Sequence, residues 1–578
     1  MWVAALTPPL ALLVIMLPLR GLIPFLDSWR FVGQYQDWLE GRYSWSAFLT
    51  LHYDHPSAVG KAVYFAVLHW MNGEVGVLPI LSWIFSAFIA VGVCLLARPL
   101  WRGNPLRGAV LMGSANLTIF STAQRESWIW DFLFQNYIPG VCLIAGILVL
   151  SFGTFTTGRI AAAALLTVAA IYSFASGFLV GLLLSLLIWN GTSGRKVAAR
   201  CLFLGAWLAF VGLVAWAAFS SGDEESFPSA ELLAPSRPAM RLQFFLVLLG
   251  RMLGEGTVVE PQKLATVAGG VLMLVFVSCA AFLICRRRDR KLVTASLPWI
   301  ICCLYGLGTA VLISLGRMQK SFNPALANRY VSLTLFFVFG TVLLAATILT
   351  HGDSATATVR WMRKGAVVFL TAFVIAHLLN WVQGYQTMKL WSLRMEQERA
   401  MLAFVRVLPP DPEWMSERKT RPSASRLAKD LADSGRLRHV TMVSDNRLSA
   451  FQQGAKVSAA WACLEKPLLL DDGRWQLRGR GGLSDSSVAD LVLITAESTA
   501  EGEQIVALAA PLPADTFWER RKERRLHPEH FLGWTRTISP ELLPKGPLTL
   551  RAYMLDSETQ LVHPVDGIHR IKDDPESH

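Results

Sequence analysis

The sequence predicts a mainly helical membrane protein that ends in a small β-rich domain. Apolar residues make up 53% of the 578-residue chain and charged residues 17%, and the mean hydropathy is +0.41. Apolar runs of about 20 residues, enough to cross a hydrocarbon core of about 30 Å, recur over the first two thirds of the chain. Short β-rich runs bounded by turn residues follow them. The chain is therefore expected to reside in a lipid bilayer.

Eleven apolar stretches are predicted to be spans. They cover residues 2–19, 77–97, 108–122, 137–155, 160–172, 177–189, 201–219, 265–285, 292–315, 331–350 and 365–382. Alternate connections are short and densely basic, as in residues 286–291, whereas the others are longer and richer in acids, Trp and Pro. The positive-inside rule places the basic set in the cytoplasm. The amino terminus is then expected in the cytoplasm and the carboxyl end outside it.

The predicted domains follow from these patterns. Residues 1–385 form the multi-span membrane domain, with a first periplasmic connection over residues 20–72. Residues 386–437 comprise an amphipathic helix and a linker, and residues 438–578 form a soluble, sandwich-like β domain. The predicted strands cover residues 491–496, 504–509, 531–538, 547–555 and 560–565.

Composition also excludes some classes of protein. The formal net charge is +12, but much of the basic excess lies in short clusters between spans, so no nucleic-acid partner is indicated. Most of the eight cysteines lie in or beside spans, so a disulfide framework is not expected. The first apolar stretch lacks a basic leader and a small-residue cleavage site, which favours a retained span.

Asp27 is the leading candidate for chemistry. It follows Leu19, the end of the first apolar stretch, by eight residues, beside Trp29 and Arg30. A carboxylate there can act as a general base, because a sugar hydroxyl that attacks an anomeric carbon must lose its proton. Glycosidases usually need a second carboxyl group to protonate the leaving oxygen, whereas a lipid phosphate departs as a stable anion. The alternative is a helix N-cap, a common position for Asp.

A second cluster contains His52, Asp54 and His55, with Lys61 on the helix that Pro56 is predicted to begin. The cluster offers two or three ligands for a divalent metal ion, or hydrogen bonds to a phosphate or sugar. The spacing fits no established zinc signature, so a polar turn before the helix is the alternative. Lys61, about two turns along that helix, would reach an anionic head group.

The third cluster lies in the connection over residues 124–136. Arg125 and Glu126 stand there beside Trp128 and Trp130. Tryptophans at span ends are ordinary interface anchors. Carboxylates are less ordinary there, so Glu126 or Asp131 is a candidate for binding an acceptor sugar or a metal.

The fourth cluster, in the connection over residues 316–330, contains Arg317, Arg329 and Tyr330. A positive group on the less basic side of the membrane suits a phosphate or pyrophosphate, which Arg binds through two parallel N–H donors. The alternative is that these cations only extend to the membrane interface.

Taken together, these residues resemble the GT-C class of membrane glycosyltransferases. That class has many spans, an acidic residue early in the first outer loop and a lipid-phosphate-linked sugar as donor. The matching residues are Asp27 just after the first span and the HYDHPS segment at residues 52–57, and the likeness extends to about residue 385. Many members have a paired acid where this chain has Asp27 and Ser28, which leaves metal dependence open.

The resemblance implies a reaction and its residues. Asp27 would be the base, Arg317 or Arg329 would hold the lipid phosphate, and Asp54, His52 and Glu126 would line the acceptor or metal site. A sugar on polyprenyl phosphate would pass, with inversion, to a cell-envelope glycan or glycolipid at the periplasmic face. The β-rich domain would bind glycan or support the acceptor.

Two other classes of protein remain open. An O-antigen-type polysaccharide polymerase or ligase would rely on Arg and His in large later loops rather than on Asp27. A lipid-linked sugar transporter or flippase would be expected to bury ionisable groups near mid-membrane and often to show repeated halves, and neither is visible here.

Overall fold

The computed structural model describes most of the chain. The described residues are 2–52, 55–153, 155–192, 196–220, 238–254, 259–317, 325, 327–351, 357–408, 422–457, 462–483, 489–498, 502–511, 533–557 and 559–571. They divide into two compact units. The first unit comprises Met1–Arg20, Gln34–Ala66 and Gly76–Leu390, and the second comprises Gly21–Gly33, Val67–Val75 and Trp391–His578.

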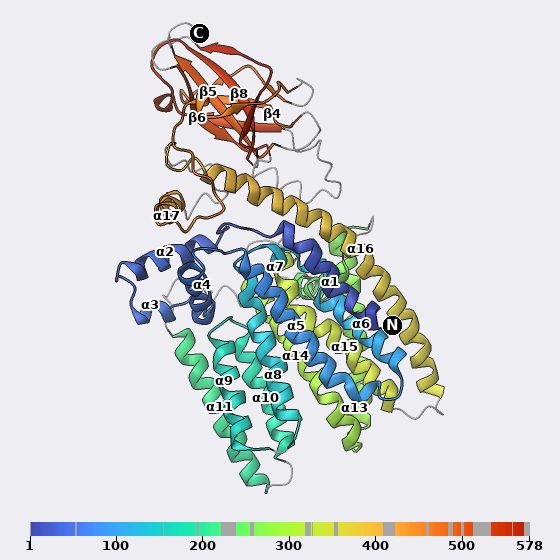
Figure 1. Cartoon of the computed structure of the whole chain (residues 1–578). Helices are drawn as coiled ribbons and strands as arrows, with labels where there is room; N and C mark the ends of the chain where they lie inside the picture. The colour runs from blue at the N-terminus through green and yellow to red at the C-terminus, as the bar shows by residue number, and fades with distance from the viewer. Residues whose placement is uncertain are drawn as a thin grey trace. The chain divides into compact units, whose positions relative to one another are not determined.

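Helices make up the greater part of the described chain (Figure 1). The α-helices are α1 (Trp2–Leu19), α2 (Ser28–Leu39), α3 (Trp45–Leu49), α4 (Ala58–Trp70), α5 (Val77–Ala97), α6 (Pro105–Ile119), α7 (Arg125–Ile129), α8 (Ile138–Ser151), α9 (Thr157–Ile171), α10 (Gly177–Gly191), α11 (Val197–Phe219), α12 (Pro238–Gly250), α13 (Pro261–Cys285), α14 (Arg290–Arg317), α15 (Val331–His351), α16 (Ala357–Leu402) and α17 (Pro422–Asp433). Short 3-10 helices are η1 (Arg98–Leu100), η2 (Thr122–Gln124), η3 (Leu133–Tyr137), η6 (Arg251–Leu253), η8 (Asn328–Tyr330), η9 (Leu448–Ala450) and η11 (Pro540–Leu542).

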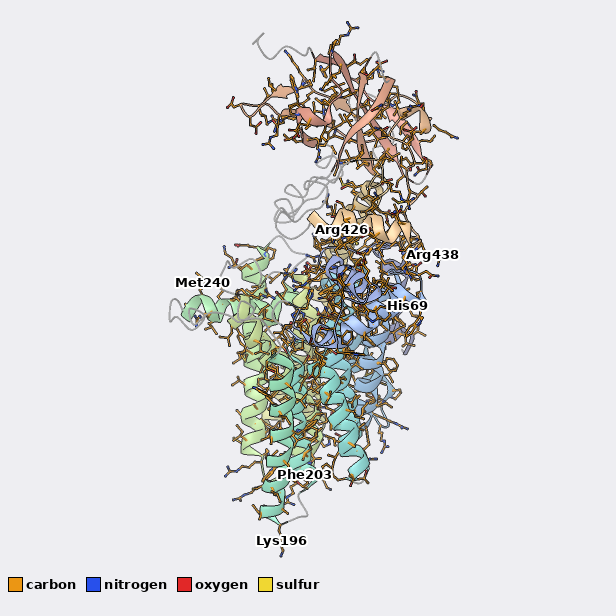
Figure 2. All side chains as sticks on the ribbon, turned by 90° about the vertical axis from the view of Figure 1, so that its left-hand side faces the viewer. His69, Lys196, Phe203, Met240, Arg426 and Arg438 are labelled. Atoms are coloured by element: carbon orange, nitrogen blue, oxygen red, sulfur yellow. The ribbon has the colours of Figure 1, made fainter. Side chains whose placement is uncertain are left out.

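The predicted spans all fall on helices, because long apolar stretches satisfy their backbone hydrogen bonds internally in lipid. Seven helices among the described residues are long and apolar enough to cross a membrane, judged by length and composition, and three shorter apolar helices accompany them. Helix α6, which carries the predicted span over residues 108–122, is in neither group of apolar helices. The total of eleven spans therefore stays a prediction. The basic connection before α11 lies at a helix end: Figure 2 shows Lys196 at the tip and Phe203 farther along α11.

The centre of the first unit is α15, whose apolar stretch is 83% buried. It packs along α14, and two glycines explain the close approach. A Cβ on Gly306 would meet the backbone of Phe337, and a Cβ on Gly340 would meet Cys303. Small residues at such crossings let two helix backbones approach closely without clashes.

Two helices depart from the sequence prediction. The stretch read as one connection over residues 221–263 contains α12, which packs against α13 where Gly250 meets Gly269. The last predicted span does not stop at residue 382, because α16 runs on to Leu402 as one helix. The separate amphipathic helix expected after residue 386 is therefore the continuation of α16, and the domain boundaries stay a prediction.

The second unit contains two β-sheets. Their strands are β1 (Gln452–Gln453), β2 (Cys463–Leu464), β3 (Leu468–Leu469), β4 (Trp475–Arg480), β5 (Leu491–Ser498), β6 (Gly502–Ala509), β7 (Gly533–Ile538), β8 (Leu548–Asp556), β9 (Leu561–Pro564) and β10 (His569–Ile571). One sheet has the order β1-β9-β8-β5-β6, with β10 also on β8; the other has the order β2-β4-β3, with β7 on β4.

The two sheets share one apolar core. Val492 and Ile494 of β5 alternate toward it, and Leu477 of β4 and Trp534 of β7 enter it from the other sheet. Alternation with a period of two places every second side chain on the same face of a strand. The predicted fold class, a helical membrane protein with a sandwich-like β domain, is confirmed.

Candidate functional site

The polar segment at residues 121–137 is the feature that organises the first unit. It comprises η2, α7 and η3, and the sequence predicts residues 124–136 of it as a connection outside the membrane. Every residue of it is buried, including Arg125 (3% exposed), Glu126 (1%) and Asp131 (1%). Buried charges are costly unless they are paired or bind something, so this segment is a strong candidate for function.

Arginines from three elements gather around this segment. Helix α7, which carries Arg125, lies against η8, which carries Arg329, and η2 lies against η6, which carries Arg251. Asn136 Nδ2 donates to the Arg329 carbonyl oxygen at 3.4 Å. Arg251 Nη2 donates to Asn328 Oδ1 at 3.1 Å, and Arg251 is only 5% exposed.

Arg251 is not among the predicted site residues, because the stretch over residues 221–263 is predicted to be one long connection. A local signal was available: the apolar run over residues 242–253 is interrupted by a single charged residue, Arg251. A single cation inside an apolar run is costly to bury, so its presence favours a specific polar or anionic partner for the side chain.

The histidine cluster contacts the same segment through His52. His52 and His55 exchange backbone hydrogen bonds, His52 N to His55 O at 2.8 Å and His55 N to His52 O at 3.3 Å. The His52 ring lies 5.0 Å from the Phe132 ring, centroid to centroid. Asp54 lies outside the described residues, and among those described no group of three His, Cys, Asp or Glu side chains could hold a metal ion.

Lys61 is buried in α4 and supports the short helix α3. Its ammonium donates to the carbonyl oxygens of Ala47, Phe48 and Thr50, at 3.2, 3.2 and 3.0 Å. These carbonyls belong to the carboxyl end of α3, where cations are favoured. One turn farther along α4, Tyr64 donates to Asp131 Oδ2 at 2.6 Å and so links α4 to the 121–137 segment.

The remaining predicted cations differ in exposure. Arg317 is the last residue of α14 and is exposed. Tyr330 is 7% exposed, and the guanidinium carbon of Arg329 lies 5.4 Å from the centre of its ring. Arg329 is therefore held over an aromatic face, next to α7, in a cation–π geometry.

Asp27 lies in the second unit, directly before α2 and half-buried. Its backbone carbonyl accepts from Arg30 N at 3.1 Å, so Asp27 occupies the position where an N-cap residue stands. Leu26 has a φ of +50°, a left-handed conformation that costs a non-glycine residue about 1–2 kcal/mol. Phe25 packs edge-on against Trp391 at 5.8 Å.

The second unit also contains a buried ion pair on α16. Arg394 and Glu398 are 4% and 3% exposed, and their nearest charged atoms are 3.3 Å apart. Both residues fall in the stretch that is predicted to be an amphipathic helix. Their spacing of four residues was visible, but only the fold shows that they are buried.

The predicted site residues thus fall into two groups. His52, His55, Lys61, Arg125, Glu126, Arg317, Arg329 and Tyr330 belong to the first unit and Asp27 to the second. Their convergence in one cavity stays a prediction.

No protein-family model and no curated protein matches the sequence. Two crystal structures of ArnT from Cupriavidus metallidurans are similar to it, one bound to undecaprenyl phosphate and one in the apo state. Identity is 13% over 77% of this chain and 89% of ArnT in the first, and 14% over 74% and 87% in the second. Both TM-scores are 0.39.

Proposed function

We propose that the protein is a membrane glycosyltransferase of the GT-C type. It moves a sugar from a polyprenyl-phosphate donor to a cell-envelope glycan or glycolipid, at the periplasmic face of the inner membrane. The observation that carries the proposal is the set of arginines, Arg125, Arg251 and Arg329, on adjoining elements around the buried 121–137 segment.

Phosphate recognition follows from the chemistry of these side chains. A guanidinium stays charged and is expensive to bury, and an anion with several oxygens offsets that cost. Arg binds phosphate through two parallel N–H donors, which fixes orientation as well as charge. We therefore assign Arg125 and Arg329 to the lipid phosphate, with Tyr330 positioning Arg329 and Arg317 on the rim.

The transfer step balances with one carboxylate. The acceptor hydroxyl oxygen forms a bond to the anomeric carbon while the bond from that carbon to the phosphate oxygen breaks. The hydroxyl proton goes to Asp27, and the bonding electrons leave with the phosphate, which needs no proton. The strained backbone at Leu26 supports this role for Asp27, because such strain concentrates where a neighbouring side chain must be held in place.

The acceptor side is assigned to His52, His55, Asp54 and Glu126. Imidazole and carboxylate groups match the hydroxyls of a sugar, because together they provide donors and acceptors of hydrogen bonds. Lys61, which caps α3, would act by holding the connection over residues 40–52 in place rather than by touching the phosphate.

A polysaccharide polymerase or ligase is the second candidate. It is favoured by one observation, that the cations and histidines gathered around residues 121–137 do not need Asp27 to form a site. In that case Arg329 would be essential for activity and Asp27 would not.

The test is glycan and glycolipid profiling of cells that carry the wild-type protein, no protein, or a single variant at normal abundance. Asp27→Asn should lose the same sugar modification as the deletion. Asp37→Asn is the matched control, because Asp37 lies on α2, the helix that Asp27 precedes, and forms an exposed ion pair with Arg42 at 2.8 Å. Such a pair contributes little to stability.

The outcomes separate the candidates. Loss in Asp27→Asn and retention in Asp37→Asn supports the transferase. If Asp27→Asn behaves like the wild type while Arg329→Gln loses the modification, the base assignment is wrong and the ligase reading takes its place.

A further inference from the structure

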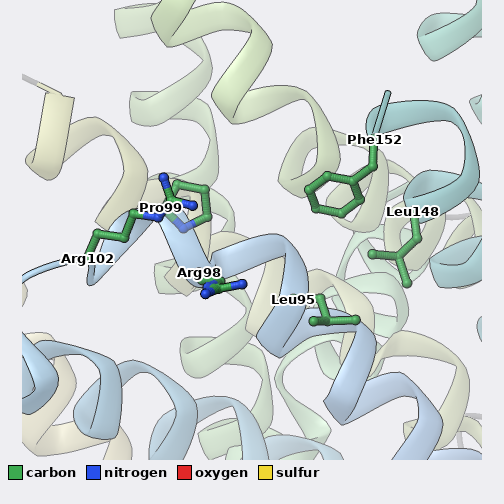
Figure 3. Close-up of a pocket in the computed structure, with 6 residues that line it drawn as sticks. All are labelled: Leu95, Arg98, Pro99, Arg102, Leu148 and Phe152. Carbon is green, nitrogen blue, oxygen red and sulfur yellow. The ribbon is translucent and has the colours of Figure 1, made fainter. Parts of the chain in front are cut away.

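A pocket lies at the carboxyl ends of α5 and α8, the opposite ends of these helices from the 121–137 segment. Its volume is about 380 Å³, and it is lined by Leu95, Arg98, Pro99, Arg102, Leu148 and Phe152. Figure 3 shows the arginines and Pro99 toward one side of the pocket, and Leu95, Leu148 and Phe152 toward the other. The pocket therefore combines a cationic wall with an apolar wall.

In the described part of the chain, no carboxylate pairs with the cationic wall. Among the described residues no Asp or Glu oxygen lies within 4 Å of the Arg98 or Arg102 guanidinium nitrogens. The surrounding stretch, residues 98–107, contains three arginines and no acid. Two neighbouring guanidinium groups without a carboxylate partner favour an anion from outside the chain.

The apolar wall continues along α5. Ile84, Phe88, Val91 and Leu95 are 39%, 62%, 59% and 47% exposed, and their spacing of three and four residues places them on one helix face. The stripe is about 16 Å long at 1.5 Å per residue, comparable to much of an acyl chain. It leads directly to Arg98, one turn after Leu95.

We propose that this pocket binds an anionic glycerophospholipid. Arg98 and Arg102 hold its phosphate, and one acyl chain lies along Leu95, Phe152 and the α5 stripe. Basic pockets between membrane helices bind acidic head groups in this way. The site is independent of the proposed transferase, since it uses none of the residues assigned to donor, acceptor or base.

The experiment uses the purified full chain in neutral detergent and native mass spectrometry. The chain is titrated with phosphatidylglycerol or with phosphatidylcholine of the same acyl chains. The wild type should bind phosphatidylglycerol more tightly, and the double variant Arg98→Gln, Arg102→Gln should lose roughly tenfold or more of that affinity. Arg287→Gln, Arg288→Gln is the control, because it removes the same charge from an exposed connection outside the pocket.

Three results would overturn the proposal. The control pair could lower affinity as much as the pocket pair, which would indicate diffuse surface charge. Phosphatidylcholine could bind equally well, which would exclude recognition of net negative charge. Glycerol 3-phosphate could displace the lipid at matching concentrations, which would make this a soluble-phosphate site. If the double variant does not fold, Arg102→Gln alone decides, because Arg102 lies on an exposed turn.

Discussion

Lys61 shows how one buried side chain can be structural although its type suggests binding. Its ammonium is surrounded by the carbonyls that end α3, and the residue is fully buried. An ammonium donates up to three hydrogen bonds, and α3 provides three acceptors. The connection over residues 40–52 therefore depends on this residue for its local shape.

We expect Lys61→Met to destabilise the protein by about 2–4 kcal/mol, because the substitution removes the three hydrogen bonds from the buried Lys61 side chain to the end of α3. The melting temperature of the detergent-purified chain should fall, and proteolysis between residues 40 and 52 should become faster. Lys263→Met, at an exposed helix start, should change neither. If Lys61→Met melts like the wild type but loses donor binding, Lys61 is a phosphate ligand instead.

The surroundings of Tyr553 in the β domain change the pKa of its hydroxyl group. Its hydroxyl donates to Glu503 Oε1 at 2.9 Å on the 6-stranded sheet, and Arg551 also donates to Glu503. Burial, followed by the hydrogen bond to Glu503 and its negative charge, raises the pKa of Tyr553 from 10.0 to about 12. The protonated tyrosine is therefore the form that the fold favours.

This shift predicts a pH dependence with a definite sign. Below pH 10.0 the stabilisation from Tyr553 is complete, and it is lost as the pH rises through about 12, because the unfolded tyrosine loses its proton first. The ultraviolet tyrosinate signal that disappears in Tyr553→Phe should titrate near pH 12 rather than 10.0. A midpoint at the ordinary value would show that the contact with Glu503 does not form.

At the scale of elements, α16 is the clearest departure from a local reading of the sequence. The stretch over residues 383–388 looks like a break, since polar residues and Gly384 follow an apolar span. The helix continues because no proline interrupts it and because Gly384 has a packing role. A Cβ there would collide with the side chain and backbone of Thr122 in η2.

This packing predicts opposite effects for two glycines of α16. Gly384→Ala should destabilise the first unit by about 1–3 kcal/mol through overpacking against η2. A Cβ on Gly365 would meet open space. Gly365→Ala should therefore be neutral or stabilise the protein by up to about 1 kcal/mol, since Ala favours the helix. Thermal melting of the two purified variants gives the comparison. Equal effects would show that α16 and η2 do not touch at Gly384.

At the scale of the whole molecule, charge and hydropathy predict the membrane topology of the chain, that is, which connections lie on which side of the bilayer. Basic residues concentrate in alternate connections, as at residues 98–107 and 286–291, while the β domain follows the last apolar helix. Short basic connections remain in the cytoplasm. The β domain should then lie on the opposite side of the membrane from those connections.

Reporter fusions in a bacterial host test this arrangement. Alkaline phosphatase fused after Arg288 should be inactive, and the same enzyme fused after His578 should be active, because phosphatase folds only outside the cytoplasm. Green fluorescent protein at the same two positions should give the reverse pattern. Equal reporter activity at both positions would contradict the predicted membrane topology.

Much of the fold could be predicted because its signals are local. Each predicted span lies on a helix, and each predicted strand between residues 491 and 565 corresponds to β5, β6, β7, β8 or β9. Helix α12 was missed because its stretch was read as one connection, and β4 because a strand bearing Arg478 and Arg480 has little apolar alternation.

The candidate site was predictable only in part. The types of residue, such as Asp27 near a span end and Arg329 in a late connection, are readable from one chain. Their surroundings are not. The burial of residues 121–137, the arrival of Arg251 beside Asn328 and the capping of α3 by Lys61 all join segments that are distant in sequence.

The sequence by itself determined that this chain is a helical membrane protein with a β domain, because hydropathy and periodicity act over neighbouring residues. Only the tertiary structure decided which charged groups are buried and which are exposed. Burial depends on what packs against each residue. Arg125 and Arg317 have the same side chain, but Arg125 is enclosed at 3% exposure, whereas Arg317 is exposed at the end of α14.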